Sequence, residues 1–324
     1  MNILVTGGAG YIGSHFVKFL LKKNENVFVF DNLSRGHAEA IPGTVKFTKI
    51  DLLDYQKLKN ALSRERIDAV VHFAAFAYVG ESVENPALYY TNNVVGSLNL
   101  IKAAVENGIK KIIFSSTCSV YGNPLKVPIS EDEPTKPINP YAESKLVIEK
   151  ILRDFETAYG LRYIALRYFN AAGADPEGEL GESHDPEPHL IPLVLQTALG
   201  AREKIYIFGD DYDTEDGTCI RDYIHVNDLA DAHYLALQYL TDSGKSDIFN
   251  LGTGTGNSVK EIIDMARKVT GKTIKSEVTA RREGDPAVLV ADNTKAKNIL
   301  GWNPGYNLED IILSAYNWHR NPKF

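Results

Sequence analysis

The amino-acid sequence predicts an α/β fold, in which a doubly wound parallel sheet is followed by a second, smaller domain. Strand patterns alternate with helix patterns through the first half of the 324-residue chain, as expected for βαβ units. A glycine-rich turn joins the first strand to the first helix, and Asp31 ends the second strand. Because this order of strand, glycine turn, helix and acidic strand end is typical of dinucleotide-binding sheets, we expect a sheet of the Rossmann type.

The apolar patterns place the elements of this sheet. The helix after the glycine turn has one apolar stripe that includes Phe16, Val17 and Leu20, at helical spacing. The segment 111–116 is nearly all apolar, as a strand that is buried on both faces should be. We expect strands at residues 3–5, 26–30, 45–50, 69–73, 111–116 and 162–168, and further helices at residues 54–66, 86–107 and 140–159.

The chain changes character after residue 171. Pro, Gly, Asp and Glu crowd residues 174–188, and the shorter elements that follow show no regular alternation. We therefore expect a Rossmann domain over residues 1–170 and a smaller α+β substrate domain over residues 171–324. Residues 226–240 are apolar enough to pack back onto the sheet, so we expect part of residues 226–251 to belong with the first domain.

The bulk composition is that of a globular protein. Hydrophobic residues make up 44% of the chain, charged residues 24%, and the net charge is −7, which gives no reason to expect a nucleic-acid partner. No apolar run reaches membrane-spanning length. The two cysteines, Cys118 and Cys219, cannot form a disulfide framework, and no Cys/His cluster has metal-ligand spacing. We expect a cytoplasmic protein without a metal site and without a membrane partner.

The glycines of the first turn indicate a pyrophosphate site. Gly7, Gly10 and Gly13 lie between a strand and a helix, where the missing Cβ permits a tight turn and the helix start presents N–H groups to an anion. Asp31 can accept hydrogen bonds from both ribose hydroxyls of NAD and would repel a 2′-phosphate. The sequence therefore predicts NAD as the cofactor.

A second group of residues predicts the chemistry. Ser116 ends the strand at residues 111–116 and Thr117 follows it directly. Tyr141 and Lys145 lie on the next helix, four residues apart and so on one face. We expect a Lys ammonium and an oxidised nicotinamide ring to favour the phenolate of Tyr141, and a pKa lower by roughly 3 units represents about 4 kcal/mol. Tyr141 could then remove a hydroxyl proton.

Two other residue patterns are interpreted as structural. Tyr55 and Lys59 have the same spacing as Tyr141 and Lys145, but their helix should be a solvated cover of the sheet, so we expect a surface pair. His72 lies on an apolar strand, and we expect a hydrogen-bonded core histidine there.

These motifs resemble those of the extended short-chain dehydrogenase/reductase superfamily and, within it, of the UDP-glucose 4-epimerase family. The resemblance covers essentially all of the chain. The glycine spacing is Gly-x-x-Gly-x-x-Gly, and the other strings that carry the resemblance are residues 31–34, 72–75, 79–82, 90–93, 120–122, 167–170, 216–218, 221–226, 250–252 and 281–285.

The resemblance implies a set of cofactor-binding residues around the predicted groove. It also implies that NAD stays bound through turnover. The implied residues are Gly7, Gly10, Tyr11, Ile12, Gly13, Asp31, Asn32, Ser34, Arg35, Gly36, Asp51, Leu52, Phe73, Ala74, Ala75, Asn92, Thr117, Tyr141, Lys145, Tyr168 and Phe169.

The resemblance also implies the reaction, which is reversible oxidation of a UDP-sugar at C4 through a 4-keto intermediate, in a homodimer. Thr117 and Tyr141 would share the proton of the 4-hydroxyl, and Lys145 would hold the nicotinamide ribose. The implied substrate-binding residues are Thr117, Tyr141, Asn170, His189, Leu190, Tyr206, Phe208, Arg221, Tyr223, Arg282 and Asp285. From the residues alone, Arg281 and Arg282 could equally form loop salt bridges, and Phe208 could be core.

Departures from the family pattern leave alternatives for the sugar. His189 stands where Asn is frequent, Ala77 replaces a Lys found in some members, and Leu289 lies near a position where others carry a bulky aromatic residue. UDP-N-acetylhexosamine and UDP-xylose or UDP-arabinose therefore remain alternative substrates to UDP-galactose and UDP-glucose. A dehydratase would need an acid and a base after Thr117, where Cys118 and Ser119 stand. A non-catalytic NAD-binding regulator is the alternative from another class.

Overall fold

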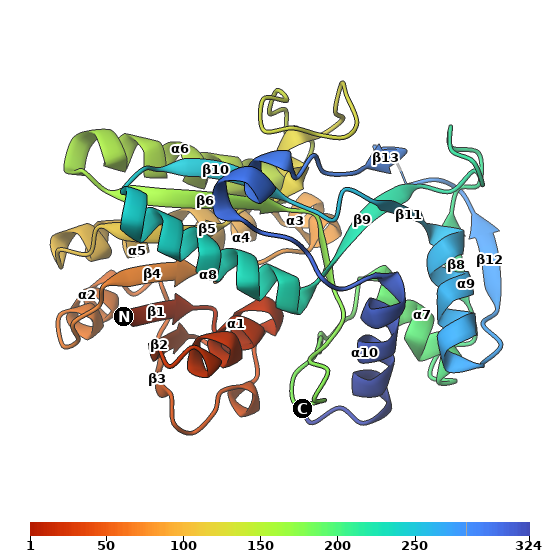
Figure 1. The fold of residues 1–324 in the computed structure, drawn as a ribbon, viewed down its shortest axis with the longest axis horizontal. Coiled ribbons are helices and arrows are strands. Elements are labelled where there is room, and N and C mark those ends of the chain that lie inside the picture. The colour runs from red at the N-terminus through yellow and green to blue at the C-terminus, as the bar shows by residue number, and fades with distance from the viewer. Residues whose placement is uncertain (283) are drawn as a thin grey trace.

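A parallel sheet of seven strands forms the centre of the larger part of the molecule in the computed structural model, which describes residues 1–282 and 284–324 (Figure 1). Glu283, part of one string quoted above, lies outside the described residues. The strand order is β10-β6-β5-β4-β1-β2-β3, and each strand pairs in parallel with its neighbours. The bounds are β1 Asn2–Thr6, β2 Asn26–Asp31, β3 Lys46–Lys49, β4 Ala69–His72, β5 Lys111–Ser115, β6 Arg162–Tyr168 and β10 Asp247–Leu251.

Helices cover both faces of this sheet, because its strands direct apolar side chains toward each face in turn. In β1, Ile3 and Val5 belong to one buried cluster and Leu4 to the other. Helices α1 (Tyr11–Lys22) and α8 (Val226–Ser243) complete the first cluster. The second is completed by α2 (Tyr55–Leu62), α5 (Gly96–Glu106) and α6 (Pro140–Tyr159). The predicted α/β class and doubly wound parallel sheet are therefore confirmed.

The strand order of the sheet changes direction at β1. The strands β2 and β3 lie on one side of β1, and β4, β5 and β6 follow on the other side. In such sheets the crevice at the carboxyl ends of the strands, at this switch point, is the place where ligands bind. The glycine turn after β1 and the polar residues after β5 both lie at this edge (Figure 1).

One predicted helical stretch has the expected extent but contains a π-helical turn. The segment predicted as one helix over residues 86–107 is divided into α4 (Pro86–Tyr89), a π-helical turn η2 (Tyr90–Val95) and α5. Asn93 in the π turn is buried, and its side chain accepts a hydrogen bond from the Phe76 N–H (2.9 Å) and donates to the Phe76 carbonyl (3.0 Å) and the Ser144 hydroxyl (3.1 Å). A single π turn inside an α-helix is the usual form of a π-bulge.

Further short elements connect the larger part. They are α3 Val79–Glu84 and the 3-10 turns η1 Ala38–Ala40 and η3 Cys118–Tyr121. Helix α6 begins where Asn139 accepts a hydrogen bond from the Ala142 N–H (2.9 Å) with Pro140 next to it, and it ends at Gly160, which is left-handed.

The smaller part of the molecule lies beyond the carboxyl ends of the large sheet (Figure 1). It has its own core, built around Val194, Ile207, Ile262 and Ile312. In contrast, α8 and β10 come from beyond residue 171 and yet pack on or within the large sheet. The elements of the smaller part are β7 Asn170–Ala172, α7 Leu190–Ala198, β8 Ile205–Phe208, β9 Ile220–His225, β11 Gly256–Ser258, α9 Val259–Thr270, β12 Ser276–Thr279, β13 Val288–Leu289 and α10 Leu308–Arg320. The π-helical turn η4 Ala296–Leu300 packs against the core of the large sheet instead.

Among the described residues, none of the helices combines the length and the apolar character that a membrane crossing requires.

Candidate active site

The turn between β1 and α1 leaves no room for side chains at two of its glycines. Gly7 has φ of +74°, and a Cβ there would lie 2.5 Å from the Ala74 nitrogen. A Cβ on Gly13 would lie 2.1 Å from the Gly7 carbonyl oxygen. Gly10 precedes the first turn of α1, and no side chain of the described residues caps this helix. Its first N–H groups are thus available to an anion.

Asp31 is fixed by the backbone around it. Its carboxylate accepts hydrogen bonds from the Ala9 N–H (3.0 Å) and the Leu33 N–H (2.8 Å). Burial raises the pKa of this carboxyl group, and the backbone hydrogen bonds oppose the shift. The carboxylate therefore lies next to the glycine turn, which is the arrangement that the sequence predicts.

A groove runs between the glycine turn and the ends of β2, β3 and β4. Three of its lining residues, Phe30, Ile50 and Phe76, were not predicted. Each of them directly precedes or follows a predicted residue, so their position next to those residues is the signal that could have found them. The predicted residues that line the groove are Gly7, Gly10, Asp31, Asn32, Ser34, Arg35, Gly36, Asp51, Leu52, Ala74, Ala75 and Asn92.

The other predicted cofactor residues lie beneath or beyond this groove. The Tyr11 hydroxyl donates to the Gly173 carbonyl (2.6 Å), and Ile12 and Phe73 pack against the core on the α1 face of the sheet. The groove is therefore lined by only part of the predicted cofactor site. The residues outside its lining are Tyr11, Ile12, Gly13, Phe73, Thr117, Tyr141, Lys145, Tyr168 and Phe169.

Thr117, Tyr141 and Lys145 come together at the carboxyl end of β5. Thr117 is buried at the start of η3, and its hydroxyl accepts a hydrogen bond from the Ser119 N–H (3.2 Å). Lys145 is buried one turn after Tyr141 on α6, and its ammonium donates to the Ser115 carbonyl (2.7 Å). Burial lowers the pKa of Lys145 to about 7, and the nearby Glu149 opposes this shift.

The pKa of Tyr141 differs from the expected direction. Burial raises it to about 12, and the neighbouring Thr117 hydroxyl opposes the shift. The expected lowering needs a positive charge at the phenol. In this structure the Lys145 ammonium is hydrogen-bonded to the backbone of β5, and it does not contribute to the pKa of Tyr141.

A buried polar network lies beneath these residues, and the sequence analysis missed it. The Glu149 carboxylate pairs with Arg167 (2.6 Å) and accepts a hydrogen bond from the Ser116 hydroxyl (2.5 Å). Arg167 also donates to the Tyr121 hydroxyl (3.0 Å). The available signal was helical spacing, because Glu149 follows Lys145 by four residues and so lies on the same face of α6.

His72 and Tyr55 have the structural roles that the sequence predicts. His72 is buried, with one ring nitrogen 2.7 Å from the Thr6 hydroxyl and the other 2.8 Å from the Ser97 hydroxyl. Burial lowers its pKa to about 3. Tyr55 donates to Glu106 (2.6 Å), which also pairs with Lys59 (2.7 Å) at the surface. Both predictions are confirmed.

The predicted substrate-binding arginines contact other side chains of the smaller part. Arg221 on β9 forms an ion pair with Asp285. The Arg282 guanidinium lies 4.0 Å from the centre of the Phe208 ring, and Phe208 is 36% exposed, so it is not a core residue. Arg281 pairs with Asp211 (2.5 Å) in a loop salt bridge, which was one of the alternatives for this residue.

The remaining predicted substrate residues are spread over four elements. Asn170 on β7 lies opposite Tyr223 on β9, and Leu190 packs against the smaller core from the start of α7. Tyr206 on β8 is exposed.

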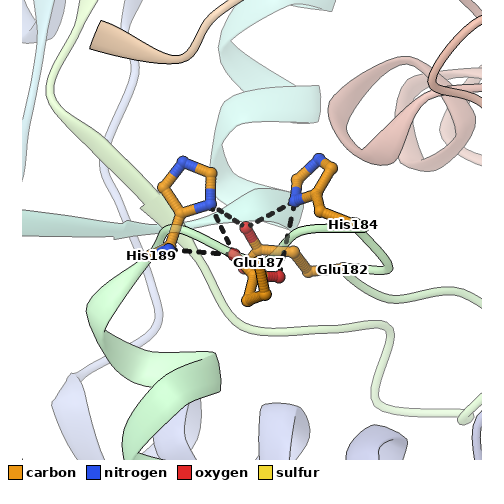
Figure 2. A group of neighbouring side chains, drawn as sticks. All are labelled: Glu182, His184, Glu187 and His189. Carbon is orange, nitrogen blue, oxygen red and sulfur yellow. Dashed lines mark hydrogen bonds and ion pairs between the residues drawn. The ribbon is translucent and has the colours of Figure 1, made fainter. Parts of the chain in front are cut away.

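His189 takes part in a cluster that the sequence analysis did not predict. Its Nδ1 lies 2.7 Å from a Glu182 oxygen and 2.9 Å from a Glu187 oxygen (Figure 2). His184 completes the cluster from the same loop. The two carboxylates raise the pKa of His189 to about 10 and that of His184 to about 9, although burial opposes both shifts.

Comparison with known proteins extends the resemblance. The model of the "NAD dependent epimerase/dehydratase family" matches residues 3–252. A curated UDP-glucose 4-epimerase of Halalkalibacterium halodurans is 57% identical over 321 residues, which are 99% of this chain and 96% of the relative.

Solved structures are equally similar. UDP-glucose 4-epimerase from Brucella ovis in complex with NAD is 49% identical, with a TM-score of 0.95 and 97% of both chains covered. UDP-glucose 4-epimerase from Bifidobacterium longum in complex with NAD+ and UDP is 40% identical, with a TM-score of 0.94 and 99% of both chains covered.

Proposed function

The chain belongs to the NAD dependent epimerase/dehydratase family, and we propose from this membership and the site that it is an enzyme interconverting UDP-glucose and UDP-galactose. The observation that carries the proposal is the convergence of Thr117, Tyr141 and Lys145 at the carboxyl end of β5, next to the glycine-lined groove. The similarity to UDP-glucose 4-epimerases over nearly the whole chain supports the same reaction. The reaction is inversion at C4 of the sugar.

The residues of the groove fit NAD. Gly7 and Gly13 permit a close approach of backbone segments that a Cβ would prevent. Helix α1 offers its first N–H groups at this turn, and Asp31 is the acceptor for ribose hydroxyls. When bound, NAD supplies reversible oxidation at the sugar C4. Lys145 is the residue proposed to hold its nicotinamide ribose, after its ammonium leaves the Ser115 carbonyl.

Tyr141 and Thr117 are proposed to hold and move the proton of the sugar 4-hydroxyl. A phenol with a pKa of about 12 binds its proton too tightly to act as a base near neutral pH. A cation brought to the phenol oxygen would lower that pKa, and Lys145 is the residue of α6 placed to supply it. Thr117 is next to Tyr141, and its hydroxyl can pass the proton between the sugar and the phenol.

The smaller part is proposed to hold the uridine diphosphate. Arg221 offers bidentate donors that match phosphate oxygens, and it would exchange its ion pair with Asp285 for the diphosphate. Phe208, Tyr206 and Arg282 present an exposed aromatic and cationic surface on and near β8. Binding of this remote group fixes the nucleotide while the sugar turns in the site.

One observation favours a wider sugar range as a second candidate. Leu289 on β13 lies opposite Arg221 on β9 and packs against the cluster that contains Phe169. A leucine there is smaller than an aromatic residue, so the site could also accept a UDP-N-acetylhexosamine. The homodimer and the cytoplasmic location remain predictions. For the homodimer, the exposed apolar residues Val83, Val95 and Leu98 of α3, η2 and α5 are a candidate surface.

The decisive experiment is incubation of the purified protein with UDP-galactose without added NAD. We expect UDP-glucose to form, because NAD should remain bound from the cell. A stable 4-keto-6-deoxy product would instead indicate a dehydratase, and bound NAD without conversion would indicate a regulator. Parallel assays with UDP-N-acetylgalactosamine and UDP-xylose measure the sugar range.

A further inference from the structure

The loop between β7 and α7 brings two glutamates and two histidines to one point. Glu182, His184, Glu187 and His189 follow the pattern Glu-x-His-x-x-Glu-x-His. Each can offer one ligand atom, and these four atoms all lie within 4.8 Å of one another. Figure 2 shows both imidazole rings directed at the two carboxylates. None of the reactions proposed above uses this convergence.

The spacing of the four atoms suits a small dication. In zinc sites the metal–nitrogen and metal–oxygen distances of about 2.0–2.2 Å place neighbouring ligand atoms of a tetrahedron about 3.4 Å apart. The four His–Glu separations are 2.7 and 2.9 Å from His189 Nδ1, and 3.3 and 3.5 Å from His184 Nδ1. Glu187 contributes a different oxygen to each histidine, and the four ligand atoms lie within 4.8 Å of one another, so side-chain rotations are needed to bring them to tetrahedral spacing.

His184 distinguishes this cluster from an ordinary hydrogen-bonded pair. Its Nδ1 atom is buried and has no hydrogen-bond partner of acceptable geometry among the described residues, although it faces both carboxylates. A buried ring nitrogen without a partner carries a desolvation penalty. A metal ion between the four side chains would remove this penalty, because it would accept the ring lone pair.

The charges of the cluster are compatible with a bound dication. The side chains of Glu182 and Glu187 are each only 5% exposed. In the part of the chain that the structure describes, no Lys or Arg forms an ion pair with either of them. Two protonated imidazoles or one dication with two neutral imidazoles would each balance the two buried carboxylates, so a dication could replace the two ring protons without leaving a net charge.

We propose that Glu182, His184, Glu187 and His189 bind one divalent transition metal ion, preferentially Zn²⁺, in a closed four-coordinate site. Two imidazoles and two carboxylates are borderline and hard ligands that suit this ion. The ion ties the loop after β7 to the start of α7 and so has a structural role. His189 is then a metal ligand rather than a substrate contact. This proposal departs from the expected absence of a metal site, because the sequence analysis considered only Cys/His spacing.

The test is metal binding by the untagged holoprotein, measured without reference to activity. After chelation and reloading with Zn²⁺, wild type should retain roughly one equivalent per chain. Loading with Co²⁺ should give the intense visible absorption of a tetrahedral complex. His184→Asn should weaken Zn²⁺ binding by more than about 100-fold, the upper range for loss of an outer-shell partner. His37→Asn is the matched control, because His37 contacts the same loop at the Ser183 carbonyl (3.1 Å) outside the cluster.

Three results would overturn the proposal. One is wild type that keeps no Zn²⁺ above the level of the His184→Asn protein, and another is a Co²⁺ spectrum of octahedral type. The third is equal loss of Zn²⁺ in His37→Asn and His184→Asn. If His184→Asn does not fold, as judged by its thermal transition, the wild-type Co²⁺ spectrum and Glu187→Gln decide instead. Epimerase activity of the wild type is a separate measurement, so the two proposals can fail independently.

Discussion

The cofactor groove and the substrate region of this molecule are built in different ways. The shape of the groove depends on the backbone. Gly7 and Gly13 permit the close approach of strand and helix, and the Asp31 carboxylate accepts hydrogen bonds from two backbone N–H groups. The substrate region consists of side chains that contact one another, such as Arg221 with Asp285. The first site is formed before its ligand arrives, whereas the second has to exchange partners.

This difference predicts how substitutions will act. A preformed groove requires little free energy to order its residues when the cofactor binds. Substitutions that distort the groove should therefore weaken cofactor binding. In the substrate region an ion pair has to be given up, and its desolvation cost sets part of the affinity. Changes there should alter KM while the cofactor stays bound. Tyr141 and Thr117 are proposed to move the sugar proton, so changes to either should alter chiefly kcat.

The largest effect is expected at Tyr141. In Tyr141→Phe the proton acceptor is lost while the ring remains, so kcat for UDP-galactose should fall about 1,000-fold, within the range for general acid–base catalysis. Bound NAD should be unchanged, as measured from the denatured protein. The matched control is Tyr55→Phe, which has the same spacing to a lysine but lies on the surface. Near-full activity of Tyr141→Phe would remove this residue from the mechanism.

A second prediction tests the backbone origin of the groove. In Gly13→Ala the new Cβ would meet the Gly7 carbonyl oxygen at 2.1 Å, so the turn has to open. We expect the affinity for NAD to fall by at least about 100-fold, which corresponds to about 2.7 kcal/mol. Gly80→Ala is the matched control, since Gly80 is also helical and a Cβ there has no atom within 4 Å. Equal NAD content in the two variants would contradict the comparison.

The sequence could predict the groove because its determinants are local. Gly7, Gly13 and Asp31 are separated by short stretches. The two glycines have no room for a Cβ, and the Asp31 carboxylate accepts hydrogen bonds from nearby backbone N–H groups. The same holds for the strands, whose apolar patterns place all six predicted members of the sheet. The π turn at residues 90–95 could not be predicted, because it depends on contacts of Asn93 with Phe76 and Ser144, far away in the sequence.

The contacts of the substrate region depend on long-range partners. Sequence reasoning left Arg281 and Arg282 with equal alternatives, and only coordinates separate the salt bridge of Arg281 with Asp211 from the stacking of Arg282 on Phe208. The cluster around His189 is local in sequence, but its significance depends on the convergence of four side chains and their burial. Residue type and spacing do not specify either of these.

A third prediction concerns the substrate region. Arg221→Lys keeps the charge but loses the bidentate donors, so kcat/KM for UDP-galactose should fall about 30-fold, or about 2 kcal/mol, chiefly through KM. NAD content should equal that of wild type. The matched control is Arg281→Lys, since Arg281 forms an exposed salt bridge with Asp211. If Arg221→Lys lost NAD instead, the proposed difference between the cofactor groove and the substrate region would be wrong.

The smallest effect is expected on stability, from a substitution of the buried residue His72 in the large sheet. Burial lowers the pKa of His72 from 6.5 to about 3, so the unfolded chain binds a proton in this pH range that the folded chain does not. The free energy of unfolding should therefore fall as the pH drops below 6.5, by at most about 1.4 kcal/mol per pH unit. In His72→Gln, urea unfolding at pH 7 and pH 5.5 should differ by about 1 kcal/mol less than in wild type. The variant will be less stable at both pH values, because the hydrogen bonds of His72 with Thr6 and Ser97 are weakened. Only the difference between the two pH values therefore tests the prediction, and an unchanged difference would mean that His72 can be protonated in the folded protein.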